Sequence, residues 1–455
     1  KMGNTIVRIL DIQIQNLKNV QNGKIKFLNS DIKKMLKLEL GDILGIYGQN
    51  GSGKTTVIDA LSVLKSILIG KSLNLELINL ITYGKEDCTL TFNFYIEINN
   101  KKYIVEYKAV LQKTRENDIE IVNEILKYSV FSEENWKKKQ LLIEVPFFNE
   151  FMETKRYKDN FLDTDSIDII VNQKLARMTR TSFIFSKEIK DIIKKESDLS
   201  NIVNALSYFG HLNLFIVSNK EIGMINLNLL LPLKIKNTTS SGEIPIQIDK
   251  NDSIIINKDI YSDVEKTIEE INEVLKKIIP NLQIKLEKQK EEISNDGIKN
   301  IIADLRSIRE GKPISLRYES EGIKRIVSIL GVLIAVYNQR SVCLAIDELD
   351  SGIFEYLLGE ILEVLSNEIK GQVIFTSHNL RILEKIDKKK IVFSTTNPNN
   401  RYIKFKYAKP SNNLRDMYLR ELIIQEQDEE LYKETKQSDI KRAFYRVGAS
   451  LDEKR

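Results

Sequence analysis

The sequence predicts an α/β fold built on a parallel sheet, with a large mixed, mainly helical insertion and a helical C-terminal tail. Three observations predict the sheet. A glycine-rich loop, Gly48–Thr55, joins an apolar run to a helix-like segment, a second apolar run ends at Asp347, and a third ends two residues before His378. Parallel strands present their carboxyl ends at one edge of a sheet, so we expect these polar residues to meet there.

The loop has the pattern G-x-x-x-x-G-K-[ST] of a P-loop, between the apolar run Ile43–Tyr47 and a segment with apolar residues at helical spacing. Glycines let the backbone turn its N–H groups inward around phosphate oxygens. We expect Lys54 to reach the β- and γ-phosphates of ATP and Thr55 to ligate Mg²⁺. The predicted cofactor-binding residues of the loop are Gly48, Asn50, Gly51, Ser52, Gly53, Lys54, Thr55 and Thr56. A chance glycine-rich turn is the alternative, which the flanking strand and helix disfavour.

Acidic and imidazole side chains follow the other two apolar runs. In "SVCLAIDELDSG", we expect Asp347 to belong to the Mg²⁺ shell and Glu348, which points the other way, to polarise an attacking water. His378 is one of only two histidines and stands where an imidazole can touch the γ-phosphate. The alternatives are a strand end with two surface acids and a purely structural histidine.

A strongly apolar helix is expected to start at "ESEGIKR", residues 319–325, and to run to about Tyr337. Ser320 is a natural N-cap, and the free N–H groups of a helix start can bind an anion. In such folds this helix faces away from the P-loop of its own subunit. We therefore expect the phosphate that it contacts to belong to a second molecule.

Taken in order, these motifs resemble the ABC-type ATPase heads of the SMC and RecF group. "YESEGIKRIVSIL", "AIDELDSGIFEYLLGEIL", "GQVIFTSHNLRILE" and "NPNNRYIKFK" are more similar to bacterial ATPases of the OLD (overcoming lysogenisation defect) and abortive-infection families. The resemblance covers residues 5–110 and 300–425. It implies signature contacts in trans from Ser320 and Gly322, metal and water roles for Asp347 and Glu348, and a switch role for His378.

The sequence also departs from the pattern of ABC heads. Glu319 stands where they usually carry Leu, Ile323 where Gln or Glu is common, and Phe354 near the usual place of a second Asp. There is no glutamine between Gln49 and Gln112 to serve as the usual metal-sensing residue. These departures concern the geometry and speed of hydrolysis more than nucleotide binding.

The composition narrows the function classes. The net charge of +5 is small for 455 residues and does not by itself indicate nucleic-acid binding. Two distant cysteines and two histidines exclude a disulfide framework and a histidine-rich metal site. The longest uncharged apolar run is too short to span a bilayer, and the start of the chain lacks the pattern of a signal peptide, so we expect a cytoplasmic protein.

We divide the chain into an N-terminal lobe of the head (5–111), an inserted lid or interaction domain (112–300), a C-terminal lobe (301–410) and a helical tail (411–455). Strands are expected near 89–98, 102–110, 282–288 and 298–308, mostly helix over 120–210, a loop at 240–245 and an amphipathic helix over 263–280. The tail is too short for a TOPRIM nuclease, which OLD proteins carry after the head.

The favoured function is an ATPase that dimerises around ATP, as a homodimer or a higher homo-oligomer built from dimers, and acts as the sensor of a bacterial anti-phage, abortive-infection system. Its partner would be a separately encoded effector, such as a TOPRIM-type or RloB-like nuclease. The alternative is a DNA-repair or chromosome-maintenance ATPase of the RecF/SMC type. A nucleotide-dependent scaffold that barely hydrolyses ATP is a third possibility.

Overall fold

The computed structural model describes most of the chain. The described residues are 5–27, 41–114, 118–146, 166–193, 197–226, 230–236, 241–247, 253–294, 296–405, 413–424, 427–433 and 435–452.

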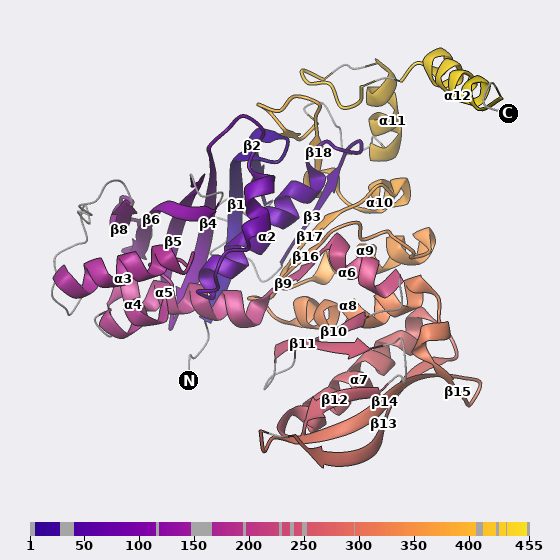
Figure 1. The fold of residues 1–455 in the computed structure, drawn as a ribbon, viewed down its shortest axis with the longest axis horizontal. Coiled ribbons are helices and arrows are strands. Elements are labelled where there is room, and N and C mark those ends of the chain that lie inside the picture. Colours follow the sequence, from indigo (N-terminus) through magenta and orange to yellow (C-terminus); the bar gives the residue numbers. More distant parts are fainter. Residues whose placement is uncertain are drawn as a thin grey trace.

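A six-stranded sheet forms the centre of the molecule, in the order β19-β18-β3-β17-β16-β9 (Figure 1). All neighbouring strands are parallel except the last pair, β18 and β19. The strands are β3 (Asp42–Tyr47), β9 (Leu214–Val217), β16 (Cys343–Ile346), β17 (Gln372–Thr376), β18 (Ile391–Ser394) and β19 (Tyr402–Ile403). The predicted strands around 43–47, 343–346 and 372–376 are confirmed and are direct neighbours.

Alternate residues of these strands face two separate cores, as the two-residue period of a strand requires. Leu44 and Ile46 of β3 belong to the core around α2 (Lys54–Leu68), whereas Ile43 and Tyr47 belong to the core on the opposite face. That second core is covered by α8 (Glu321–Asn338), α9 (Glu355–Glu368) and α10 (Leu380–Lys385). The sheet is thus buried on both sides, which explains its uninterrupted apolar runs.

A second, antiparallel sheet covers the outer side of α2, so that α2 lies between the two sheets (Figure 1). Its order is β2-β1-β4-β5-β6-β7, with β8 also paired to β6. The strands are β1 (Thr5–Leu17), β2 (Val20–Lys26), β4 (Asp87–Ile98), β5 (Lys101–Lys113), β6 (Ile119–Ser132), β7 (Asn135–Trp136) and β8 (Gln140–Pro146). The boundary predicted at residue 112 therefore falls inside β5, and the sheet continues into the segment that we assigned to the insertion.

The expectation of mostly helix over 120–210 is wrong for its first part, because β6 to β8 occupy residues 119–146. Helices follow further along the chain: α3 (Ser166–Met178), α4 (Lys187–Ile192) and α5 (Asp198–Tyr208). The π-helical segment η3 (Phe209–Asn213) continues from α5, and the 3₁₀-helix η2 (Leu75–Leu80) lies earlier, before β4. The alternation of apolar and polar residues that would predict strand β6 is interrupted at Glu124, because this carboxylate occupies a buried position of the strand. It accepts hydrogen bonds from Tyr107 Oη (2.6 Å) and from the backbone N–H of Phe183 (2.7 Å). Burial raises its pKa.

A further lobe lies on the α8 side of the central sheet. It contains α6 (Asn219–Asn226), β10 (Leu230–Lys236), β11 (Ser241–Gln247), β12 (Ser253–Asn257), α7 (Lys258–Ile278), β13 (Leu282–Ile293), β14 (Lys299–Arg309), β15 (Lys312–Ser315) and η4 (Leu316–Tyr318). The predicted amphipathic helix and the strand pair after it are confirmed as α7, β13 and β14. The loop expected at 240–245 is wrong over its described part, which is strand β11 paired with β10.

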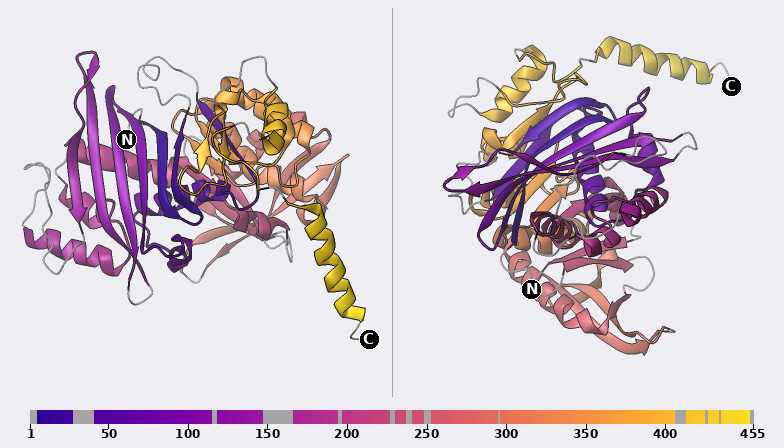
Figure 2. Two further views of the ribbon diagram at one scale, coloured as in Figure 1. Left: turned by 90° about the horizontal axis from the view of Figure 1, so that it is seen from above. Right: turned by 90° about the vertical axis from the view of Figure 1, so that its left-hand side faces the viewer.

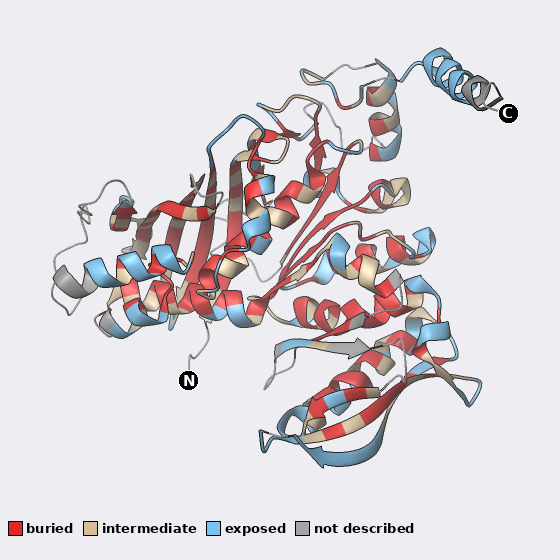
Figure 3. Ribbon diagram, in the orientation of Figure 1, coloured by how far each residue is buried: buried red, intermediate tan, exposed pale blue. Residues whose placement is uncertain are grey.

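The tail consists of α11 (Leu414–Ile424) and α12 (Gln437–Asp452). The short 3₁₀-helix η5 (Lys388–Lys390) belongs to the head and directly precedes β18. Both views of Figure 2 show α12 projecting from the body of the molecule. Most of α12 is exposed (Figure 3). Among the described helices, none has the length and apolar character needed to cross a bilayer.

One buried side chain joins the two sheets. Gln372, at the start of β17, accepts from the backbone N–H of Ile9 (2.7 Å) and donates to the carbonyl oxygen of Ile9 (2.8 Å). The side-chain amide of Gln372 therefore satisfies both backbone groups of Ile9 at the point where β1 meets the central sheet.

We predict that Gln372→Ala lowers the free energy of unfolding by about 1–3 kcal/mol, because the N–H and C=O of Ile9 lose their partner inside the protein. Urea unfolding followed by tryptophan fluorescence and circular dichroism measures the change. Gln283→Ala, at an exposed position of β13, is the matched control and should leave stability within experimental error. Equal stability of both variants would contradict this role.

Candidate nucleotide-binding site

The P-loop follows β3 and needs its glycines for two reasons. Gly51 (φ 76°) and Gly53 (φ 91°) adopt left-handed backbone conformations, which side chains disfavour. At Gly48 a Cβ atom would lie 2.0 Å from Ser394 Oγ, so a side chain has no room. The backbone of the predicted loop is thus fixed by conformation and by packing, while Asn50 and Gly51 at its tip are exposed and Ser52 and Thr56 are buried.

Segments from both lobes hold the loop in place. Asn19, in the turn between β1 and β2, donates its side-chain amide to Gly51 O, and Tyr402 Oη donates to Gly53 O (2.6 Å). Arg401 donates to the backbone oxygens of Asn19 and Thr395. The sequence analysis gave none of these residues a role, although Arg401 and Tyr402 lie in the quoted stretch "NPNNRYIKFK".

Lys54 lies across the mouth of the loop. Its Nζ donates to Gly48 O and Gln49 O, each at 2.9 Å. Burial lowers the pKa of this ammonium, and the nearby carboxylates of Asp347 and Glu348 oppose the shift. The side chain is long enough to exchange these carbonyl contacts for phosphate oxygens.

The Asp347 carboxylate at the end of β16 meets the start of α2. Its Oδ1 accepts from Thr376 Oγ1 (2.6 Å) and from Thr55 Oγ1 (3.2 Å), so β16, β17 and the P-loop converge on one atom. Its Oδ2 is buried without a hydrogen-bond partner within the described residues. A buried carboxylate oxygen beside a threonine hydroxyl is a donor set that Mg²⁺ accepts, so Thr55 and Asp347 fit the predicted metal role.

Glu348 is held in a left-handed conformation (φ 46°), which costs a residue other than glycine about 1–3 kcal/mol. Its backbone N–H donates to Thr376 Oγ1 (2.8 Å), and Arg325 Nη2 donates to its carbonyl oxygen (2.6 Å) and to that of Asp347 (2.9 Å). Burial lowers the pKa of Arg325 to about 10. Arg325 and Thr376 therefore hold the backbone of Glu348 in this conformation, a positioning role that no motif indicated.

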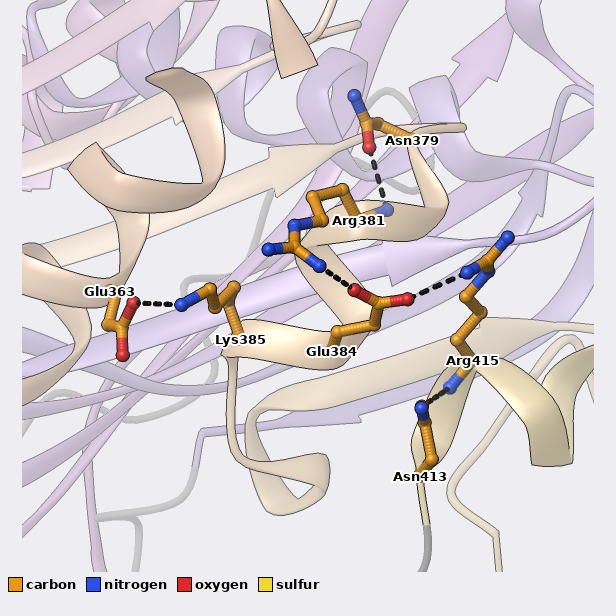
Figure 4. Close-up of polar contacts among 7 residues, drawn as sticks. All are labelled: Glu363, Asn379, Arg381, Glu384, Lys385, Asn413 and Arg415. Carbon is orange, nitrogen blue, oxygen red and sulfur yellow. Dashed lines mark hydrogen bonds and ion pairs between the residues drawn. The ribbon is translucent and has the colours of Figure 1, made fainter. Parts of the chain in front are cut away.

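His378 lies beyond β17, on a cavity of about 460 Å³ that Asp350, Tyr356 and Arg381 also line. Its backbone N–H donates to Asp350 Oδ2 (3.2 Å). Figure 4 shows polar contacts around the neighbouring helix α10, where Arg415, which also lines the cavity, donates to Glu384 (2.8 Å), and Lys385 donates to Glu363 (2.7 Å). Burial and then the charge of Lys54 lower the pKa of His378, so its imidazole is neutral at pH 7.

The helix α8 begins as predicted. Ser320 is its N-cap, and its Oγ accepts from the backbone N–H of Ile323 (3.3 Å) while the residue stays exposed. A Cβ atom on Gly322 would lie 2.0 Å from Gly352 O, so this glycine allows α8 to contact the loop that follows Asp347. Glu319, which replaces the usual Leu, pairs with Arg309 (2.9 Å). The contact of Ser320 and Gly322 with a second molecule stays a prediction.

A P-loop between a parallel strand and a helix is the feature that defines the class of the P-loop NTPases. In this chain Asp347 and Glu348 follow β16, and His378 follows β17, which lies between β3 and β16. The chain belongs to the family described as "AAA domain, putative AbiEii toxin, Type IV TA system", which matches residues 43–384, about three quarters of its length.

No curated protein matches the sequence. Three solved structures illustrate its similarity to others. An SMC head bound to the C-winged helix domain of ScpA is 12% identical, with 88% of this chain and 98% of that chain covered and a TM-score of 0.46. The SMC head domain from Thermotoga maritima (14% identity, 88% and 99% covered) has a TM-score of 0.37. RecF with ATP (13% identity, 88% and 100% covered) has a TM-score of 0.36. The family assignment rests on the family match alone.

We predict that His378 titrates below the ordinary value of 6.5 and that Lys54→Ala moves its pKa back toward 6.5, because the neighbouring positive charge is gone. Below pH 6.5 the unfolded chain binds the proton first, so this histidine lowers folding stability as the pH falls. The proton NMR signals of the imidazole give the pKa, and His211→Asn assigns them. A pKa of His378 that does not change in Lys54→Ala would show that the two groups are not close.

Proposed function

We propose that this protein binds ATP with Mg²⁺ and hydrolyses it at a site shared by two copies of the chain. The observation that carries the proposal is the convergence of Thr55 and Thr376 on Asp347 Oδ1, beside an Oδ2 atom that is buried and accepts no hydrogen bond from the part of the chain that the structure describes. This is the arrangement in which a P-loop, a metal-holding carboxylate and a water-activating carboxylate work on one triphosphate.

The roles of the side chains follow from their places. The N–H groups of the P-loop and Lys54 bind the phosphates, and Thr55 and Asp347 hold Mg²⁺, which when bound neutralises charge on the phosphate oxygens. Glu348 accepts the proton of the attacking water from its fixed position. His378, neutral at pH 7, donates a hydrogen bond to the γ-phosphate from the end of β17.

Closure of the site requires a second chain. Ser320 is exposed at the start of α8, where its helix offers free N–H groups, and its side chain faces no phosphate of its own protomer in our assignment. We assign this helix start and Gly322 to the γ-phosphate of ATP bound by the other copy. ATP then stabilises the closed dimer by mass action, and hydrolysis releases it.

The biological role that we propose is that of a sensor in a bacterial anti-phage, abortive-infection system of the OLD-like kind. The family description and the quoted stretches that resemble OLD and abortive-infection ATPases support this role. The effector would be a separately encoded nuclease of the TOPRIM or RloB-like type. Expression with the genes that flank its own, followed by phage challenge, tests this part: protection that is independent of Lys54 and Glu348 would exclude it.

The rival role, an ATPase acting on DNA, requires a basic surface. Three of the four lysines that line the hollow beside Trp136 on the antiparallel sheet are instead paired with acids: Lys139 with Glu106 (2.8 Å), Lys137 with Glu133 (2.6 Å) and Lys24 with Asp11 (3.9 Å). Such neutralised pairs release few counterions on binding DNA. ATP turnover that rises on addition of DNA and falls steeply with salt would favour the rival.

We predict that Glu348→Gln keeps ATP affinity but lowers turnover by about 10²–10⁴-fold, because the amide cannot accept the proton of the attacking water. Release of phosphate and binding of a fluorescent ATP analogue measure the two properties. Lys54→Ala is the contrasting control and should lose ATP binding. Normal turnover in Glu348→Gln would place water activation elsewhere.

We predict that Ser320→Arg protein alone does not turn over ATP, because the arginine blocks the helix start that serves the partner's phosphate. Mixed equally with Lys54→Ala protein, it should regain about a quarter of wild-type activity, since half of the dimers then contain one intact composite site. The measurement is phosphate release across mixing ratios. Activity that stays at zero in every mixture would rule out a site shared in this way.

A further inference from the structure

Two side chains hold the backbone around His378. Tyr47 is the last residue of β3, and its Oη donates to the carbonyl oxygen of Asn379 (3.0 Å). The backbone N–H of His378 itself donates to Oδ2 of Asp350, in the loop after β16 (3.2 Å). One contact lies before the Cα atom that carries the imidazole and the other lies after it, so the two together fix both sides of this residue.

Further hydrogen bonds fasten the same loop to β3 and to itself. The backbone N–H of Ser377 donates to the carbonyl oxygen of Ile46 (3.3 Å), and the backbone N–H of Asn379 donates to Ser377 Oγ (2.9 Å). Asn379 is also the N-cap of α10, where its side chain accepts from the backbone N–H of Arg381 (2.8 Å; Figure 4). The backbone N–H groups of residues 377, 378 and 379 are therefore all bonded, and the chain between β17 and α10 has little freedom to move.

Tyr47 is a rigid donor because its ring and its backbone are both fixed. The side chain is buried, and its ring packs beside that of Phe393 in β18, with the ring centroids 6.4 Å apart. Its carbonyl oxygen accepts from Ser394 Oγ (3.1 Å), the atom that leaves no room for a side chain at the next residue, Gly48. A buried hydroxyl is costly unless it is hydrogen-bonded, as this one is. Tyr47 therefore links the first residue of the P-loop to the loop of His378.

Asp350 is placed by the turn that follows the carboxylate pair. The backbone N–H of Leu349 donates to the carbonyl oxygen of Thr376 (3.0 Å), which attaches this turn to the end of β17. The backbone N–H of Ile353 donates to the carbonyl oxygen of Asp350 (3.3 Å) and closes the turn. Asp350 and His378 line the same cavity. Asp350 therefore joins the segment after β16 to the segment after β17.

Neither side chain is suited to binding phosphate itself. Asp350 is an acid, which phosphate oxygens repel, and Tyr47 is buried with its hydroxyl already bonded. Both therefore act through the residue whose backbone they hold. Hydrogen bonds to a transferring phosphoryl group depend on donors that are in place before the reaction, and a misplacement of about 1 Å can cost about 10²-fold in rate.

We propose that Tyr47 and Asp350 are positioning residues for His378. They fix the backbone on both sides of the imidazole before nucleotide arrives, so its hydrogen bond to the γ-phosphate forms without rearrangement of the loop. The expected effect on turnover rests on the proposed function of His378, whereas the placement of its backbone does not.

Amide hydrogen exchange tests the placement without nucleotide. Protein labelled with ¹⁵N-histidine contains two labelled residues, and His211→Asn assigns the signal of His378. The backbone N–H of His378 should exchange at least about tenfold faster in Tyr47→Phe and in Asp350→Ala, because the loop loses one of its two fixed points. Tyr95→Phe is the matched control, since it removes a tyrosine hydroxyl that is bonded within β4 of the outer sheet, and it should leave the rate unchanged. Unchanged exchange in both loop variants overturns the proposal.

Turnover tests whether this placement serves the reaction. Tyr47→Phe should lower kcat by about 10²-fold and leave KM within about threefold, because a misplaced imidazole affects the transition state more than ATP binding. Asp350→Ala should lose activity to a similar extent, whereas Asp350→Asn should keep most of it, since an amide oxygen can still accept the N–H of His378. In the His378→Ala background, Tyr47→Phe should have no further effect, because the group that it positions is gone. A further loss of similar size in that background would show that Tyr47 acts by another route.

The two measurements separate this proposal from the proposed function. Normal turnover of His378→Ala protein would contradict the role of the imidazole in hydrolysis. The exchange rates would still decide whether Tyr47 and Asp350 fix the loop that carries it.

Discussion

The Asp347 carboxylate is the point on which the site depends. Thr55 of the P-loop and Thr376 of β17 both donate to its Oδ1, and the three residues come from segments separated by up to 321 positions in the sequence. They meet because β17 lies between β3 and β16 in a parallel sheet, so the carboxyl ends of all three strands open on the same edge. The long intervening chain completes other parts of the protein. It adds strands to the outer sheet, contributes β9 to the central sheet and builds the α7 lobe.

How much could be predicted depended on whether a residue acts through its side-chain type or through a backbone contact. Strands β3, β16 and β17 of the central sheet were predictable because they are short and apolar and lead directly into polar or glycine-rich segments, and the P-loop has a pattern fixed by phosphate chemistry. Strand β6 was misread because the buried Glu124 breaks its apolar alternation, and only the folded state supplies Tyr107 and the N–H of Phe183 as partners. Asn19 and Tyr402 donate to P-loop carbonyls, and such contacts impose no spacing that a sequence shows.

A series of contacts connects Glu348 with the lobe that contains α6 and β10. Its Oε1 lies 3.5 Å from the side-chain amide of Asn219, the first residue of α6. Two residues further, Glu221 pairs with the buried Lys234 of β10 (2.9 Å), which also pairs with Glu243 of β11 (2.6 Å). Because β10 packs against α8, a shift of Glu348 between nucleotide states would act on the helix whose start we assign to the partner's phosphate. This is a continuous physical path, and the Glu348→Gln variant would change its first contact.

The loop to which we assign phosphate binding also contacts the tail. Gln49, the second residue of the P-loop, accepts from the backbone N–H of Lys433, only four residues before α12. Any change in the side chain of Gln49 when nucleotide enters the loop therefore acts on the chain just before α12.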